Sequence, residues 1–220
     1  MSVLVYVEQA NGKFKKSVYE AVSYAKAIAD KQGTNLTAIS IGNVADGELK
    51  ELGKYGASKV LNVTNEQLKS FVNQAYAAVI AEAAEKEGAA TLVLSNSFSG
   101  KGLAPRIAVK LKAGLVDGAV ELPNFDNGFT VKKTAFSGKA FAITTLTSAN
   151  KVIALNKWIK EYAEAHKLVY LDYHTAMKDE KNGLPKNLAN DGIHPTKEGY
   201  AIMEPMVKEA IAKVLKQKMK

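Results

Sequence analysis

Four short apolar runs alternate with segments of helical periodicity along the first part of the chain. Within residues 17–33, apolar residues recur three or four positions apart and share one helix face: Val18, Ala21, Val22, Ala25, Ile28 and Ala29. Strands separated by helices indicate right-handed crossovers and a parallel sheet that is covered on both faces. The predicted strands are residues 2–8, 35–42, 59–63 and 91–97.

Capping residues mark the ends of two predicted helices. Gly33 follows the first helix, and a long helix is expected over residues 65–88, with Asn65 as its N-cap and Gly88 just past its last residue. Residues 97–114 (SFSGKGLAPRIAVKLKAG) are interpreted as a loop that leads into a helix. The N-terminus of that helix can attract an anion, but an exposed turn at Gly100 and Gly102 is favoured over a ligand site.

The pattern then changes to alternation of apolar and polar positions. Residues 128–136 (GFTVKKTAF), 139–147 (KAFAITTLT) and 150–156 (NKVIALN) are joined by short turns, as antiparallel strands are. The predicted fold class is therefore α/β. We expect a mainly parallel sheet with flanking helices, of the adenine-nucleotide α-hydrolase type, plus antiparallel strands.

Residues 156–220 are expected to add a helix-strand-helix tail. An amphipathic helix leads into a predicted strand over residues 168–173, and a long polar loop precedes the terminal helix over residues 196–217. Thr196 is the expected N-cap of that helix. Pro205 should kink or restart it, because proline lacks the backbone donor that the helix needs.

Charge and composition limit the function classes. The formal net charge is +8, but of 30 lysine and arginine residues only Arg106 is an arginine, and the lysines are dispersed, so nucleic-acid binding is not expected. No apolar run reaches the roughly 20 residues of a membrane span, and the N-terminus lacks the pattern of a signal peptide, so we expect a cytoplasmic protein without membrane contact. With no cysteine and only scattered histidines, no metal site is expected.

Two long stretches resemble one family. Residues 92–122 (LVLSNSFSGKGLAPRIAVKLKAGLVDGAVEL) and 128–156, together with the opening segment 3–29, resemble the N-terminal domain of the electron transfer flavoprotein α subunit. The resemblance covers residues 1–155 and rests on an ordered succession of blocks. One departure is visible, since the family has arginine shortly before an aromatic-x-Gly turn whereas Lys132 and Lys133 stand here.

The resemblance implies a partner-docking module. In that family the α subunit holds FAD chiefly through a second, C-terminal domain, while the N-terminal domain packs against a β subunit. That second domain is absent here, so we expect an electron transfer flavoprotein β-like subunit as partner. FAD is implied by the family, but this chain alone is not expected to retain it, and no cofactor-binding residue is assigned.

The block NDGIHPTKEGY, residues 190–200, resembles the end of the SGNH or GDSL-type serine hydrolases. The resemblance implies that Asp191 orients His194, which would deprotonate a nucleophilic serine. The family's Gly-Asp-Ser block is absent, and the serines at positions 95, 97 and 99 follow the fourth strand without the required aspartate. We therefore expect no catalysis by the chain alone.

Two domains follow from these resemblances. Residues 1–155 are predicted to form the flavoprotein-type domain, and residues 156–220 an incomplete hydrolase-like segment. Three functions stay open: a docking module without a redox centre, a remnant of an SGNH esterase, and a chimera without selected activity. The first is favoured.

Overall fold

The structure is a computed structural model that describes residues 2–135, 140–156, 168–180, 184–189 and 195–218. Contacts divide the chain into two compact units. The first comprises Met1–Thr134 with Phe141–Trp158, and the second comprises Ala135–Ala140 with Ile159–Lys220. The domain limits predicted at residues 155 and 156 stay a prediction.

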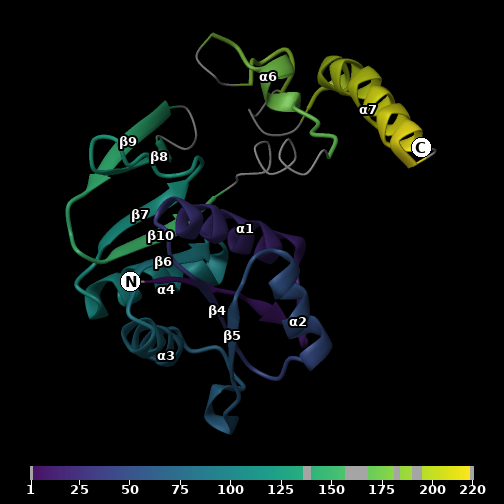
Figure 1. Cartoon of the computed structure of the whole chain (residues 1–220). Helices are drawn as coiled ribbons and strands as arrows, with labels where there is room; N and C mark the ends of the chain where they lie inside the picture. Colours follow the sequence, from purple (N-terminus) through teal and green to yellow (C-terminus); the bar gives the residue numbers. More distant parts are fainter. Residues whose placement is uncertain (1, 136–139, 157–167, 181–183, 190–194, 219–220) are drawn as a thin grey trace. The chain divides into compact units, whose positions relative to one another are not determined.

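An eight-stranded sheet forms the first unit, in the order β5-β4-β1-β6-β10-β7-β8-β9 (Figure 1). The pairs β1–β4, β1–β6, β4–β5, β6–β10 and β7–β10 are all parallel, which confirms the predicted mainly parallel α/β fold. The strands of this sheet are β1 (Ser2–Tyr6), β4 (Leu36–Ile41), β5 (Lys59–Val63), β6 (Ala89–Ser95), β7 (Gly114–Ala119), β8 (Phe129–Ala135), β9 (Ala140–Leu146) and β10 (Lys151–Leu155). A short antiparallel hairpin, β2 (Gln9–Ala10) with β3 (Lys13–Phe14), follows β1.

The prediction of an antiparallel strand over residues 150–156 is wrong. β10 lies between β6 and β7 and pairs with both in parallel. Its four residues Val152–Leu155 are at most 4% exposed, so the run is apolar on both faces. Continuous apolar burial is what a central parallel strand requires, because helices cover both of its faces. Antiparallel pairing is confirmed where β7 meets β8, with Ala119 opposite Lys133.

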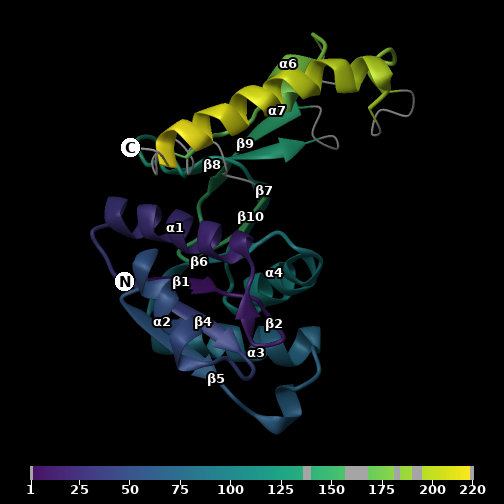
Figure 2. The same ribbon diagram turned by 90° about the vertical axis from the view of Figure 1, so that its right-hand side faces the viewer.

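Helices cover both faces of the sheet (Figure 2). α1 (Lys16–Lys31) packs on β1, β4 and β6, and all six apolar residues predicted for its inner face are buried. α3 (Asn73–Lys86) and α4 (Phe98–Lys110) pack on the other face and against each other. α2 (Asp46–Lys54) lies next to β5.

The single helix expected over residues 65–88 is two helices. Asn65 caps only a 3-10 turn, η1 (Glu66–Leu68), by accepting a hydrogen bond from the Gln67 backbone N–H at 2.9 Å. The Tyr76 hydroxyl then donates to the Leu68 carbonyl at 2.8 Å, so a side chain uses an acceptor that a continuous helix would give to its backbone. The predicted end is confirmed, because Gly88 follows α3 with φ of 60°.

The second unit contains α6 (Tyr173–Met177) and α7 (Lys197–Lys218), which contact each other. The strand predicted over residues 168–173 is wrong, because residues 168–172 form no strand and α6 begins at Tyr173. The Asp172 carboxylate accepts hydrogen bonds from the Thr175 backbone N–H and hydroxyl, which starts a helix instead. The helix predicted before it lies mostly outside the described residues.

The predicted cap of the last helix is confirmed. The Thr196 hydroxyl accepts a hydrogen bond at 3.2 Å from the backbone N–H of Gly199, which lies three residues later in the first turn of α7. α7 continues through Pro205. The expected kink there stays a prediction.

Candidate functional site

The carboxyl ends of β1 and β6 form the candidate site. Strand order reverses here, since β1 is followed on one side by β4 and β5 and on the other side by β6. In open α/β sheets, ligands bind beyond the carboxyl ends of the strands at this switch point. Glu8 follows β1 by two residues, and Ser97 follows β6 by two residues and precedes α4.

The carboxylate of Glu8 binds the two serines at the start of α4. The Ser97 hydroxyl donates to one carboxylate oxygen and the Ser99 hydroxyl to the other, both at 2.7 Å. Ser97 also caps α4, because its hydroxyl oxygen accepts from the Gly100 backbone N–H at 3.0 Å. A helix N-terminus favours negative charge, and here the protein supplies that charge from Glu8, just after β1.

Gly100 allows α4 to begin this close to β6. A Cβ atom at this position would lie 1.9 Å from the Ser95 carbonyl oxygen, far inside van der Waals contact. Residues 98–102 are therefore helical, and the expectation of an exposed loop at Gly100 is wrong: the residue is buried in the first turn of α4. Close backbone approach, rather than a flexible turn, explains the glycine.

Phe98 lies between Ser97 and Ser99, the two serines that donate to Glu8. Its side chain is 97% exposed, although its backbone neighbours Ser97 and Ser99 are both hydrogen-bonded to Glu8. Val109, at the other end of α4, is 79% exposed. Single exposed apolar side chains are common on protein surfaces, whereas several gathered on one face can mark a contact with another molecule.

The lysines that depart from the family pattern form ion pairs near the end of β7. Lys133 pairs with Asp117, and Lys132 pairs with Glu121 at 2.5 Å. The hydrogen bond from Lys133 holds the pKa of the Asp117 carboxyl below its usual value. The Lys132 ammonium also lies 4.6 Å from the centre of the Phe141 ring. Both lysines that stand near the family's arginine position are thus ion-paired.

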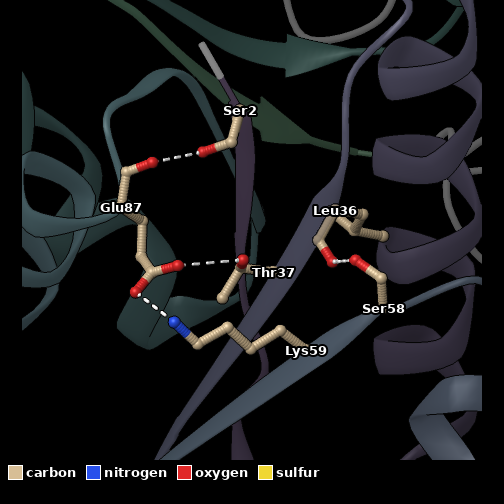
Figure 3. A network of polar contacts seen from close by, with 6 residues as sticks. All are labelled: Ser2, Leu36, Thr37, Ser58, Lys59 and Glu87. Carbon is tan, nitrogen blue, oxygen red and sulfur yellow. Dashed lines mark hydrogen bonds and ion pairs between the residues drawn. The ribbon is translucent and has the colours of Figure 1, made fainter.

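A second polar network lies at the opposite edge of the sheet, where the strands begin (Figure 3). The Glu87 carboxylate accepts from Thr37 at 3.3 Å and pairs with Lys59 at 2.7 Å, while its backbone carbonyl accepts from Ser2 at 2.7 Å. These contacts join β1, β4 and β5 to the end of α3. We interpret this network as structural, because the ligand-binding edge of such sheets is the other one.

The residues predicted for catalysis, Asp191 and His194, lie outside the described residues, and their roles stay predictions. Among the residues that the structure describes, no group of three or more histidine, cysteine, aspartate or glutamate side chains could hold a metal ion. Among these same residues, no helix has the length and apolarity needed to cross a membrane.

The family model of the electron transfer flavoprotein domain matches residues 3–167. The chain belongs to this family.

Electron transfer flavoprotein α subunits are among the relatives. That of Thermoanaerobacterium thermosaccharolyticum is 33% identical over 141 residues, which cover 64% of this chain and 43% of the relative. Protein FixB of Clostridium saccharobutylicum is 33% identical over 144 residues, 64% of this chain and 42% of its own length. The acryloyl-CoA reductase electron transfer subunit beta of Anaerotignum propionicum is 33% identical over 113 residues, 51% of this chain and 31% of its own length. The chain thus spans less than half the length of these relatives.

Among solved structures, a universal stress protein in complex with cAMP aligns with 50% of this chain and 90% of its own, at 21% identity and a TM-score of 0.35.

The candidate site does not fit a flavin phosphate. A phosphate at the start of α4 would meet the Glu8 carboxylate, which already accepts from both serine hydroxyls. The Gly100 N–H, a donor that a phosphate would use, is bound to Ser97. A phosphate bound next to the Glu8 carboxylate would be repelled by its negative charge, so the residues at this edge of the sheet disfavour an anionic ligand.

The sequence reasoning missed Glu8 as a functional residue. It follows β1 by two residues, and its partners stand 89 and 91 residues away, so no local spacing links them. A carboxylate directly after the first strand, with serines directly after the strand at the switch point, is the signal that was available.

Proposed function

We propose that this chain is an α-type docking module of an electron transfer flavoprotein-like complex, which binds a β-like subunit and holds no flavin itself. The observation that carries the proposal is the family match over residues 3–167. The Glu8 carboxylate supports the proposal that the chain holds no flavin, because this carboxylate occupies the place at the switch point where an anionic group would bind. The proposal places the complex in the cytoplasm.

The docking role is proposed for the part of the chain that matches the family model, residues 3–167. In this proposal the chain supplies a rigid α/β surface and positions the partner.

Co-expression tests the docking proposal. The tagged chain is produced with electron transfer flavoprotein β subunits, one of them from Thermoanaerobacterium thermosaccharolyticum. The affinity-purified material is analysed by electrophoresis and by its visible absorption, which detects bound flavin. We expect a β subunit to co-purify, and the chain purified alone to be colourless. Absence of every β subunit would refute docking, and flavin bound to the chain alone would refute the proposal that it holds no flavin.

For residues 156–220 we propose an incomplete SGNH-type segment in which Asp191 and His194 have no serine to activate. The absence of a Gly-Asp-Ser block supports this proposal, as does the binding of the Ser97 and Ser99 hydroxyls to Glu8. A fluorophosphonate probe tests it. We expect no labelling, and labelling that His194→Ala abolishes would show a working hydrolase instead.

A further inference from the structure

The outer face of α4 carries an apolar stripe. Phe98, Pro105 and Val109 are exposed and are separated by seven and four residues, which places them on one side of the helix. Phe98 is 97% and Val109 79% exposed. At a rise of 1.5 Å per residue, these three residues, called the α4 stripe below, extend over about 16 Å.

Cations border the α4 stripe on both sides. Lys101, Arg106 and Lys110 are exposed on α4, and the helix contains no aspartate or glutamate. Arg106 is the one arginine of the chain. Its guanidinium donates to the Gly102 carbonyl at 2.7 Å, which directs the side chain along the helix surface. Arginine and aromatic side chains are the residue types most enriched at the energetic centre of protein interfaces.

The α4 stripe is held rigidly from behind. Glu8 fixes the serines on both sides of Phe98, and the inner face of α4 is buried in the core through Leu103, Ala104, Ile107 and Ala108. A contact surface that is ordered before binding loses less conformational entropy on association. The exposure of Phe98 is therefore a built feature of the first turn rather than the fraying of a helix end.

We propose that the α4 stripe, with Lys101, Arg106 and Lys110, is the surface that docks the partner protein. The partner surface that fits is an apolar pocket for Phe98 bordered by carboxylates that pair with the three cations. This inference rests on the proposed function, so the occupant is the β-like subunit. A second copy of this chain would bring the same cations together, which disfavours self-association through this face.

Matched variants of the co-expressed complex test the surface. Phe98→Ala removes the exposed phenyl group, and Arg106→Glu reverses the charge at an exposed position. Ile143→Ala on β9 and Lys50→Glu on α2 make equivalent changes at exposed positions of other elements. The affinity of each variant for the β subunit that binds the wild-type chain is measured by titration calorimetry, after thermal unfolding has shown that each variant is folded.

We expect Phe98→Ala and Arg106→Glu each to weaken binding about tenfold or more, with the Arg106→Glu loss shrinking as salt rises, and both control variants to bind like wild type. Unchanged affinity of the two α4 variants beside a wild-type chain that binds would refute this surface and leave the docking function intact. Failure of the wild-type chain to bind any β subunit would refute both. Binding of the wild-type chain to phosphatidylserine vesicles that Arg106→Glu abolishes, without any effect on the β subunit, would assign the face to lipid and overturn the proposal.

Discussion

Glu8 links two elements that the sequence separates by about ninety residues, and it does so with charge-assisted hydrogen bonds from Ser97 and Ser99. Such bonds are stronger than neutral ones, and loss of the shared acceptor leaves two partly buried hydroxyls without their partner. The charge also favours the N-terminus of α4. A single side chain thus stabilises the helix start and disfavours an anion there.

Glu8→Ala should lower the free energy of unfolding by about 2 kcal/mol, because it removes both hydrogen bonds and the favourable charge. Urea unfolding measures this loss. Glu85→Ala, at an exposed position of α3, is the matched control and should change stability by less than about 0.5 kcal/mol. Inorganic phosphate should raise the melting temperature of Glu8→Ala more than that of wild type. Equal stability of the two glutamate variants would contradict the role given to Glu8.

Tyr6 is 5% exposed at the end of β1, and burial, followed by the nearby Glu8 and Tyr76, raises the pKa of its hydroxyl above the ordinary value of 10.0. The unfolded state therefore loses this proton at lower pH than the folded state. The stability linked to Tyr6 is fully present below pH 10 and is lost as the pH rises further.

We predict that Tyr6→Phe reduces the fall in stability between about pH 10 and pH 12, since the variant has no proton to lose at this position. Urea midpoints of wild type and variant at a series of alkaline pH values measure the difference. A fall of the same size in both proteins would contradict this assignment. The midpoints at pH 7 give the separate effect of removing the hydroxyl.

At the scale of elements, the start of α4 depends on how closely it approaches β6. Gly100→Ala would place a methyl group 1.9 Å from the Ser95 carbonyl oxygen, so the helix or the strand must move. We expect a loss of about 3 kcal/mol or more in the free energy of unfolding. Gly53→Ala, in α2, meets no atom within 4 Å and should be neutral or stabilising. Thermal unfolding of the two variants compares them directly, and similar melting temperatures would show that α4 can shift freely.

The position of β10 in the middle of the sheet gives a further prediction. Ile153 is fully buried in β10, whereas Ile143 is 75% exposed in β9. Ile153→Ala should therefore cost about 2 to 5 kcal/mol, and Ile143→Ala less than about 0.5 kcal/mol. Chemical denaturation of both variants tests this ranking. A reversed ranking would contradict the strand order.

These elements also show what local sequence can predict. The strands β1, β4, β5 and β6 and the inner face of α1 follow from apolar periodicity, because burial of one helix face and of both strand faces leaves a direct pattern. Local alternation predicts the wrong partners for β10, since pairing depends on residues far away in the chain. The start of α6 was missed because Asp172 can end a strand or cap a helix, and the hydrogen bonds to Thr175 decide between them. The hydrogen bonds of Glu8 also join residues far apart in the chain, so local sequence does not predict them.

At the scale of the whole molecule, the first unit has two features. The Glu8 carboxylate occupies the point where the strand order reverses, and the outer face of α4 exposes cations and apolar side chains. Both features depend on the start of α4. The Glu8 carboxylate, which accepts from Ser97 and Ser99, disfavours an anionic ligand and orders the segment that carries Phe98. In the proposed function, this unit binds a partner through a helix face that is ordered before binding.

Light scattering of the purified chain mixed with an electron transfer flavoprotein β subunit tests this account most directly. The account predicts a stable heterodimer, with a mass equal to the 23.6 kDa chain plus one β subunit, and no flavin absorbance from the chain by itself. Two separate peaks at every concentration, or a yellow chain that keeps its colour without the partner, would contradict it.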